Sequence, residues 1–366
     1  MSYPPLWGRF SRPRPLGADS LPEDLIVGDD VKTTFKRIIK RCLLVSGAIS
    51  TFASLRQAGV VILRYHSVLE NPQDLDDVIG CGIVHSAAVF EQQMQLLSES
   101  FVPVTMDDVL DFAKCNKKIP RRAVAVTFDD GFADNATVAA PIMARYGIRG
   151  AFYVTTGTIS PYQPPWFIAL RRAFRCSKRK EIVSPLDGTR FQLDVPQDHR
   201  QAFIQSCSHC AVLDLDEQIH WVAQVEKFLE IESYQDKYGL MMTEEQIKGL
   251  HFAGHIVGSH TVSHPNVAHI SESRINVELE HSKSELERVL GAEIVHFSYP
   301  SPILQPHYDE RTIRLSREVG YRTAVTCTHG LVYPGDEPLA CHRIFVPDNI
   351  ADFRWSIESA LAGFPP

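Results

Sequence analysis

Three clusters of polar residues in this 366-residue sequence carry the side chains that bind metal ions and transfer protons. They are Tyr65-His66-Ser67, Thr127 to Gly131 and Ser259 to His264. Each cluster directly follows an apolar run of the kind that forms a buried strand. Barrels and open α/β sheets place their active sites at the carboxyl ends of the strands, so we expect the three clusters to share one site.

The adjacent carboxylates Asp129 and Asp130 are suited to a division of labour. Neighbouring side chains at a strand end point in different directions, so one carboxylate could ligate a cation while the other takes a proton from what the cation binds. The structural alternative is that one of the two caps a helix beginning after Gly131.

His260 and His264 are four residues apart, a spacing at which two imidazoles can point at one metal ion. The pattern alone is weak, because the chain has 15 histidines and His251 and His255 have the same spacing. We exclude that second pair as a chelate, since Gly254 is expected to end its helix. One aspartate and two histidines leave positions open for water, which is typical of a catalytic site and acidifies that water.

His66 is a candidate proton donor, because imidazole titrates near neutral pH. A single histidine at a strand end is, however, more often structural. Its role therefore depends on whether the first strand lies beside the other two clusters.

The elements that must position these clusters alternate between strand and helix, which is typical of a parallel α/β sheet or barrel. Amphipathic patterns predict helices at 88–100, 136–146, 271–290 and 310–319. Apolar runs predict seven strands, at 60–65, 123–128, 150–155, 255–259, 294–299, 322–326 and 343–346. Seven strands favour a barrel.

The alternation divides the chain into a tail with a basic helix, residues 1–57, and a main domain, residues 58–366. It breaks at about 160–240, where prolines and helical patterns at 203–213 and 219–229 predict a mainly helical insertion that covers the site. Trp166, at the start of the insertion, could stack on a sugar ring or could anchor packing.

The composition excludes disorder and collagen, because 44% of the residues are hydrophobic and 22% are charged. With a net charge of -7, the chain lacks the excess of basic residues that is typical of proteins that bind nucleic acid. The eight cysteines are scattered as reduced thiols would be, and the Cys207 to Cys210 pair lacks the second pair that a closed zinc site needs.

The first thirty residues contain no apolar secretory segment, so we expect a cytoplasmic protein. Between Lys32 and Arg56 there are six basic residues and no acidic one. This segment could lie on the cytoplasmic face of a membrane as a peripheral contact, or it could be a helix packed on the main domain.

The run Thr127 to Gly131, the pair His260 and His264 and the segment Phe297 to Pro300 together resemble the polysaccharide deacetylase family, the NodB-homology domain of carbohydrate esterases. The resemblance spans roughly residues 58–350. It implies a distorted (β/α) barrel of about seven strands with Asp129 as general base. It also implies a divalent metal, zinc with cobalt or nickel as alternatives, held by Asp130, His260 and His264.

Two motifs depart from the usual family pattern. The Leu-x-His motif that carries the acid histidine in many members is missing; Tyr65-His66 resembles instead a permuted subgroup that acts on poly-N-acetylglucosamine, so we prefer His66 over His342 as general acid. In the third motif His296 stands where arginine is usual. Backbone N–H groups near Tyr299 are the expected oxyanion donors, and Pro302 removes one donor from that loop.

The activity that the resemblance implies is hydrolysis of N-acetyl groups on an amino-sugar glycan, such as an N-acetylglucosamine oligosaccharide, an exopolysaccharide or a precursor. One alternative is hydrolysis of another C–N bond, as in a small cyclic amide. The other is a catalytically silent glycan-binding module whose altered third motif has disabled the oxyanion site.

Overall fold

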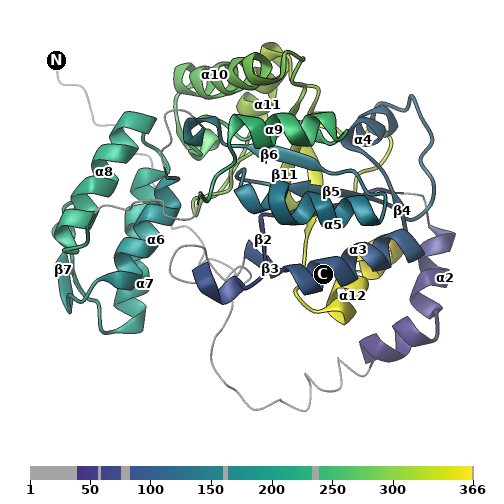
Figure 1. Cartoon of the computed structure of the whole chain (residues 1–366), viewed down its shortest axis with the longest axis horizontal. Helices are drawn as coiled ribbons and strands as arrows, with labels where there is room; N and C mark the ends of the chain where they lie inside the picture. Colours follow the sequence, from purple (N-terminus) through teal and green to yellow (C-terminus); the bar gives the residue numbers. More distant parts are fainter. Residues whose placement is uncertain (1–38, 57–58, 76–82, 160–163, 233–238, 365–366) are drawn as a thin grey trace, which may run out of the picture.

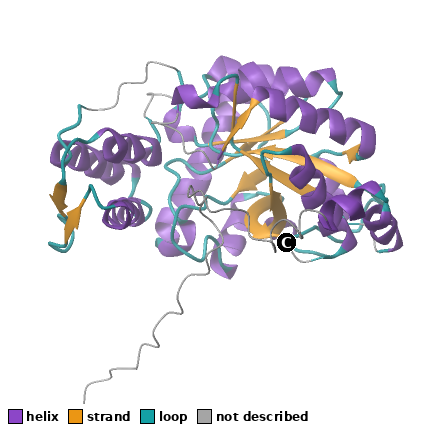
Figure 2. Ribbon diagram, turned by 90° about the horizontal axis from the view of Figure 1, so that it is seen from below, coloured by secondary structure: helices purple, strands orange, loops and turns teal. Residues whose placement is uncertain are grey.

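Seven parallel strands close into a barrel in the computed structural model, which describes residues 39–56, 59–75, 83–159, 164–232 and 239–364 (Figures 1 and 2). The first strand, β1, pairs with both β12 and β5 and so completes the ring. All seven predicted strands are present, with ends shifted by at most three residues, and the predicted barrel is confirmed. They are β1 (Val61–Tyr65), β5 (Ala123–Phe128), β6 (Ala151–Val154), β9 (Ile256–Ser259), β10 (His296–Ser298), β11 (Thr323–His329) and β12 (Cys341–Phe345).

Alternate residues of the strands face the barrel interior and the outer helices, as the two-residue period of a strand requires. In β1, Leu63 packs in the outer core, whereas Ile62 packs in the interior with Ala125 and Cys341. The interior cluster also contains apolar side chains of α4 (Met106–Ala113), which follows the short strand β4 (Val102–Pro103) beside the start of β5. Apolar side chains thus fill the end of the barrel where the strands begin.

Helices pack around the outside of the barrel, and serine side chains cap the starts of two of them. Ser86 caps α3 and Ser271 caps α10, while Gly291 ends α10 with a positive φ of 64°. The helix predicted at 136–146 is instead a π-helix, Asn135–Ala139, followed by α5; Pro141 at the start of α5 lacks the N–H that would continue a regular ladder. The outer helices are α3 (Ala87–Ser100), α5 (Ala140–Arg145), α9 (Glu244–Phe252), α10 (Glu272–Leu290), α11 (Glu310–Val319) and α12 (Ile350–Ala362).

The segment between β6 and β9 forms a lobe beside the barrel, on the left in Figure 1. It contains α6 (Trp166–Cys176), α7 (Pro196–Cys210), α8 (Leu215–Phe228) and a hairpin of β7 (Glu181–Val183) and β8 (Arg190–Gln192). Its apolar side chains form a core of their own. Cys207 and Cys210 are buried in that core, where burial raises the pKa of both thiols and disfavours the thiolates that zinc would need.

A short strand pair, β2 (Ser67–Leu69) and β3 (Val84–Ser86), lies next to the end of β1. The chain before β1 forms helical residues 39–45 and α2 (Ala48–Leu55), and α2 packs against α12. The remaining parts of the predicted tail, residues 1–38 and residue 57, lie outside the described residues.

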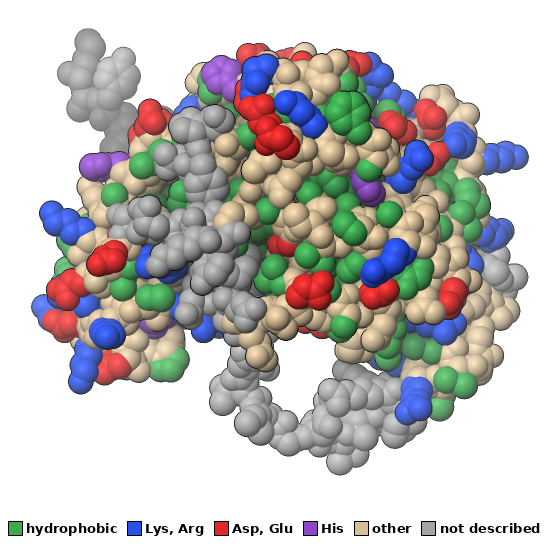
Figure 3. Space-filling view, viewed as in Figure 1, with side chains coloured by type: hydrophobic (Ala, Val, Ile, Leu, Met, Phe, Trp, Pro, Cys, Tyr) green, Lys and Arg blue, Asp and Glu red, His purple; other side chains and the backbone are tan. Residues whose placement is uncertain are grey.

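The surface in Figure 3 shows acidic and basic side chains interspersed over one face of the molecule. Within the described ranges, no helix combines the length and the apolar character that crossing a bilayer requires.

Candidate active site

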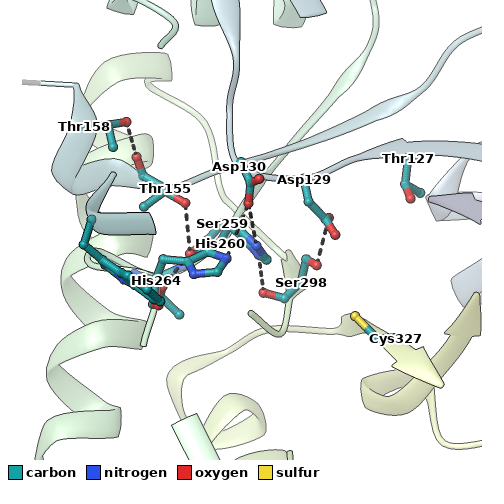
Figure 4. Close-up of polar contacts among 12 residues, drawn as sticks. Thr127, Asp129, Asp130, Thr155, Thr158, Ser259, His260, His264, Ser298 and Cys327 are labelled. Atoms are coloured by element: carbon teal, nitrogen blue, oxygen red, sulfur yellow. Dashed lines mark hydrogen bonds and ion pairs between the residues drawn. The ribbon is translucent and has the colours of Figure 1, made fainter. Parts of the chain in front are cut away.

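One aspartate and two histidines converge at the carboxyl ends of β5 and β9 (Figure 4). The Oδ1 atom of Asp130 lies 3.4 Å from Nε2 of His260 and 3.4 Å from Nε2 of His264. One ligand atom from each residue lies within 4.8 Å of the other two, and all three residues are buried. The arrangement is therefore compact enough to hold one metal ion.

The hydrogen bonding of His260 leaves its Nε2 atom available to a cation between these groups. The Nδ1 atom of His260 lies 2.8 Å from the carbonyl oxygen of Ser298, which can only accept, so Nδ1 carries the proton. In the neutral imidazole Nε2 carries a lone pair directed toward Asp130, so both groups offer electron pairs to a cation lying between them. Two imidazoles and one carboxylate form a typical donor set for a catalytic metal, and these residues fit a divalent cation.

The site is built on strained backbone. Asp130, Thr261 and His264 have positive φ values of 74°, 69° and 55°, a region that non-glycine residues rarely occupy. Such conformations cost about 1–3 kcal/mol each and persist only where neighbouring groups enforce them. The strain lies in the ligands themselves or beside them, as expected for a preorganised functional site.

Buried polar groups enforce the loop that carries the two histidines. The carboxylate of Glu278 accepts hydrogen bonds from the Val262 and Ser263 N–H groups and from the Ser263 hydroxyl, at 2.7, 2.9 and 2.6 Å. On the other side, Gly157 donates its N–H to Val262 O at 2.8 Å. A Cβ atom at position 157 would lie 2.5 Å from that oxygen, so the close approach requires glycine.

Packing from the insertion holds the second histidine. The indole N–H of Trp166 donates to the carbonyl of His264 at 3.2 Å, and the Phe167 ring centroid lies 4.9 Å from the imidazole. Trp166 is only 5% exposed. Of the two roles considered for Trp166, the structure supports the packing anchor.

Asp129 points into the barrel interior and is fixed there by a buried arginine on β12. The Arg343 guanidinium donates to Oδ1 and Oδ2 of Asp129 at 2.9 and 2.7 Å, and the Ser298 hydroxyl donates to Oδ1 at 2.9 Å. Burial alone would raise the pKa of Asp129, but the adjacent guanidinium holds it well below its ordinary range. Asp129 is therefore ionised.

His66 follows β1 and lies within electrostatic range of both aspartates. Burial lowers the pKa of His66 to about 4, although the charges of Asp130 and Asp129 favour its protonated form. Its carbonyl accepts a hydrogen bond from the Asn135 side chain at 2.7 Å. The same amide also donates to Asp134, which accepts from Ser67 Oγ and Val68 N. This buried network fixes the chain around His66.

The alternative acid, His342, is directed away from this site. Its strand neighbours Cys341 and Arg343 face the interior, and a Cβ atom on Gly330 would lie only 2.7 Å from His342 Nδ1. The structure thus brings Asp129, Asp130, His66, His260 and His264 together but leaves His342 outside.

The expectation for Tyr299 needs correction. Its N–H donates to the carbonyl of Val325 at 3.1 Å, extending the pairing of β10 with β11, so it is not free to bind an oxyanion. Its side chain is buried, with the hydroxyl 3.4 Å from Ser316 Oγ. Tyr299 therefore supports the strand end as a packing residue.

Sequence reasoning missed Arg343, Glu278 and Asp134. Arg343 opens the strand predicted at 343–346, and the signal that could have found it is a charged residue within a strand expected to be buried, where it needs a partner. Glu278 and Asp134 lie on helical segments, where a charged residue normally indicates the solvated face. Nothing local distinguishes them from surface carboxylates.

Comparison with known proteins gives a match to the family model described as polysaccharide deacetylase over residues 116–189 and 218–324. The matched ranges contain both aspartates and both histidines of the converging cluster. His66 and Arg343 lie outside them.

Individual relatives are distant. An uncharacterised 30.6 kDa protein of Geobacillus stearothermophilus is 34% identical over 84 residues, which cover 23% of this chain and 30% of that protein. The structure of the Streptococcus pyogenes deacetylase PplD in complex with acetate is similar with a TM-score of 0.55 and 18% identity, covering 85% of this chain and all of PplD. IcaB from Ammonifex degensii has a TM-score of 0.54 and 19% identity, covering 83% of this chain and 99% of IcaB. These structures show a shared fold.

Proposed function

Because this chain belongs to the polysaccharide deacetylase family, we propose that it removes N-acetyl groups from an amino-sugar glycan by metal-dependent hydrolysis. The observation that carries the proposal is the convergence of Asp130, His260 and His264 beside the buried, ionised Asp129. The resemblance of Tyr65-His66 to the subgroup acting on poly-N-acetylglucosamine favours an N-acetylglucosamine polymer, oligomer or precursor as substrate.

Asp130, His260 and His264 would hold the metal ion. A divalent metal bound there would polarise the amide carbonyl and activate a water molecule. Asp129 lies next to this position and accepts the proton of the attacking water, while Arg343 and Ser298 fix the orientation of its carboxylate. The zinc assignment rests on the donor set, with cobalt and nickel as alternatives.

His66 then protonates the departing amine. Nitrogen is a poor leaving group unless it receives a proton as the C–N bond breaks. With a pKa of about 4, His66 is mostly neutral at pH 7, so it has to gain a proton during the reaction before passing it on. Its place beside both aspartates suits such a relay.

The test is acetate release from N-acetylglucosamine oligomers by protein loaded with zinc, cobalt or nickel. We expect turnover that a chelator abolishes and that Asp129→Asn lowers by about 10² to 10⁴. Asp111→Asn, the same substitution on the exposed face of α4, serves as the control with unchanged turnover. Metal binding without acetate release from any oligomer would overturn the glycan assignment and favour a small cyclic amide or a binding role.

We also propose a peripheral membrane contact through residues 39–56, the described part of the basic segment. Val45 is 80% exposed and Phe52 is 56% exposed, near the basic residues Lys40 and Arg41. Sedimentation with anionic vesicles should depend on these apolar side chains, and vesicle binding unchanged by Val45→Ser with Phe52→Ser would contradict the contact. The cytoplasmic location stays a prediction.

A further inference from the structure

At the mouth of the barrel lies an arginine, Arg64, that has no carboxylate partner in the described part of the chain. Arg64 shares the interior-facing side of β1 with Ile62, and it is half-buried. Its positive charge lowers the pKa of both His66 and His307, which places it close to both imidazoles. Among the residues that the structure describes, none forms a hydrogen bond or ion pair with its guanidinium.

The nearby carboxylates are already engaged. Asp129 is bound by Arg343 through both oxygens, and Asp130 faces His260 and His264. Burial and the Arg64 charge lower the pKa of His307 to about 4, so this imidazole brings no second charge at pH 7. Arg64 is left as a cation whose partial burial no described carboxylate offsets, although burying an unpaired charge is costly.

The register partner of Arg64 on the neighbouring strand carries an exposed aromatic ring. Phe345 on β12 is its register partner in the parallel pair, so the two side chains leave the sheet on the same face. Phe345 is 52% exposed at the carboxyl end of its strand. An aromatic face suits the apolar face of a sugar ring, and the guanidinium fork suits a carboxylate or a phosphate.

The spacing relates this pair to the reacting amide. His66 comes two residues after Arg64, directly past the end of β1, and two residues of extended chain span about 7 Å. That distance is on the order of one sugar unit. A group bound at Arg64 would therefore belong to the N-acetylated sugar or to its direct neighbour.

We propose that Arg64 and Phe345 form a subsite for an acidic sugar residue, one that carries a carboxylate or a phosphate ester beside the N-acetyl group that is removed. The proposal rests on the deacetylase function and specifies its substrate class. Arg64 binds the anion through charge-assisted hydrogen bonds, and Phe345 packs against the sugar ring.

The test compares kcat/KM for three substrates: a neutral N-acetylglucosamine tetramer, a tetramer that alternates glucuronate with N-acetylglucosamine, and N-acetylglucosamine 1-phosphate. We expect the protein to prefer at least one anionic substrate, and the carboxylate and phosphate arms identify which. Arg64→Gln should lower the anionic-to-neutral ratio of kcat/KM about tenfold or more, and Arg64→Lys should retain part of it. Arg145→Gln, which removes an exposed arginine paired with Glu91, should leave the ratio unchanged.

A binding measurement separates this proposal from the proposed function. With Asp129→Asn protein, calorimetry should show at least tenfold weaker binding of the preferred anionic glycan when Arg64→Gln is added, whether or not acetate is released from any substrate. Absence of a preference for anionic glycans, or equal losses on neutral and anionic ones, overturns the subsite. Turnover of the neutral tetramer alone would leave the deacetylase function intact and the subsite rejected.

Discussion

At the scale of single residues, the buried pair of Asp129 and Arg343 determines how the carboxylate can act. When one partner of such a buried ion pair is removed, the other charge stays buried without compensation, which strongly destabilises the protein. The motif around Asp129 made the aspartate easy to predict, whereas the partner comes from a strand more than two hundred residues later. Only the closure of β1 on β12 brings the two together.

Replacing Arg343 should damage catalysis through the protonation of Asp129. Without the guanidinium, burial raises the pKa of Asp129, so the acidic limb of the kcat/KM profile should move up by more than one pH unit. We expect Arg343→Met to lower kcat/KM about 10² to 10³-fold at pH 6, with Arg343→Lys less affected. A profile with lower rates but an unchanged acidic limb would contradict this role.

A second buried carboxylate should make stability depend on pH. Burial raises the pKa of Asp134 to about 7, so between about pH 4 and pH 7 the folded protein holds a proton that the unfolded chain has lost. The free energy of unfolding contributed by this group is therefore present in acid and is lost as pH rises through 7.

Asp134→Asn keeps the size of the side chain and removes its titration. The free energy of unfolding of the variant minus that of the natural protein should therefore rise by on the order of 2 kcal/mol from pH 5 to pH 8. Urea unfolding at the two pH values measures this difference. Asp111→Asn should show none, and the same stability difference for Asp134→Asn at both values would refute the shift.

At the scale of elements, the loop after β9 depends on a close backbone contact that one glycine allows. A Cβ on Gly157 would lie 2.5 Å from Val262 O, in the middle of the segment that carries His260 and His264. Gly157→Ala should therefore displace the loop and weaken zinc or cobalt binding by about tenfold or more.

Gly249 in α9 provides the matched control for that substitution. A Cβ there meets nothing within 4 Å, and alanine in a helix is more favourable than glycine by roughly 0.5–1 kcal/mol. Gly249→Ala should bind metal normally and unfold at a slightly higher temperature. Equal metal affinity in both variants would show that the loop tolerates the added methyl group.

Elements with a long apolar run or stripe could be predicted from the sequence, whereas very short ones could not. The seven barrel strands were predicted because each is a buried apolar run, and the long helix α10 because its apolar stripe ends at Gly291. The strands β7 and β8 have three residues each, and only the central residue of each is buried. Three residues are too few for a two-residue period to be recognised in the sequence. The metal ligands were recognised as motifs, but the contacts of Glu278 arise only from folding.

At the scale of the whole molecule, one buried carboxylate joins three distant segments. Glu358 on α12 is fully buried and accepts from Arg122 at 2.8 and 3.1 Å and from Ser50 on α2 at 3.0 Å. Arg122→Ala would leave this charge without its main partner and should lower the free energy of unfolding by roughly 2–3 kcal/mol. Arg322→Ala removes a half-exposed pair with Glu293 and should cost at most about 1 kcal/mol. Equal losses in thermal or urea unfolding would contradict the assignment.

The packing of α2 on α12 also determines which end of the barrel would face the solution if the enzyme were attached to a surface through α2. Residue 56 receives a hydrogen bond from Arg121, just before β5 begins, and the Phe52 and Phe364 rings lie 6.5 Å apart. These residues belong to the end of the barrel where strands start, whereas the reacting groups lie at the opposite end. An enzyme immobilised through α2 on a bead or a lipid film would thus hold its mouth outward, toward glycan arriving from solution.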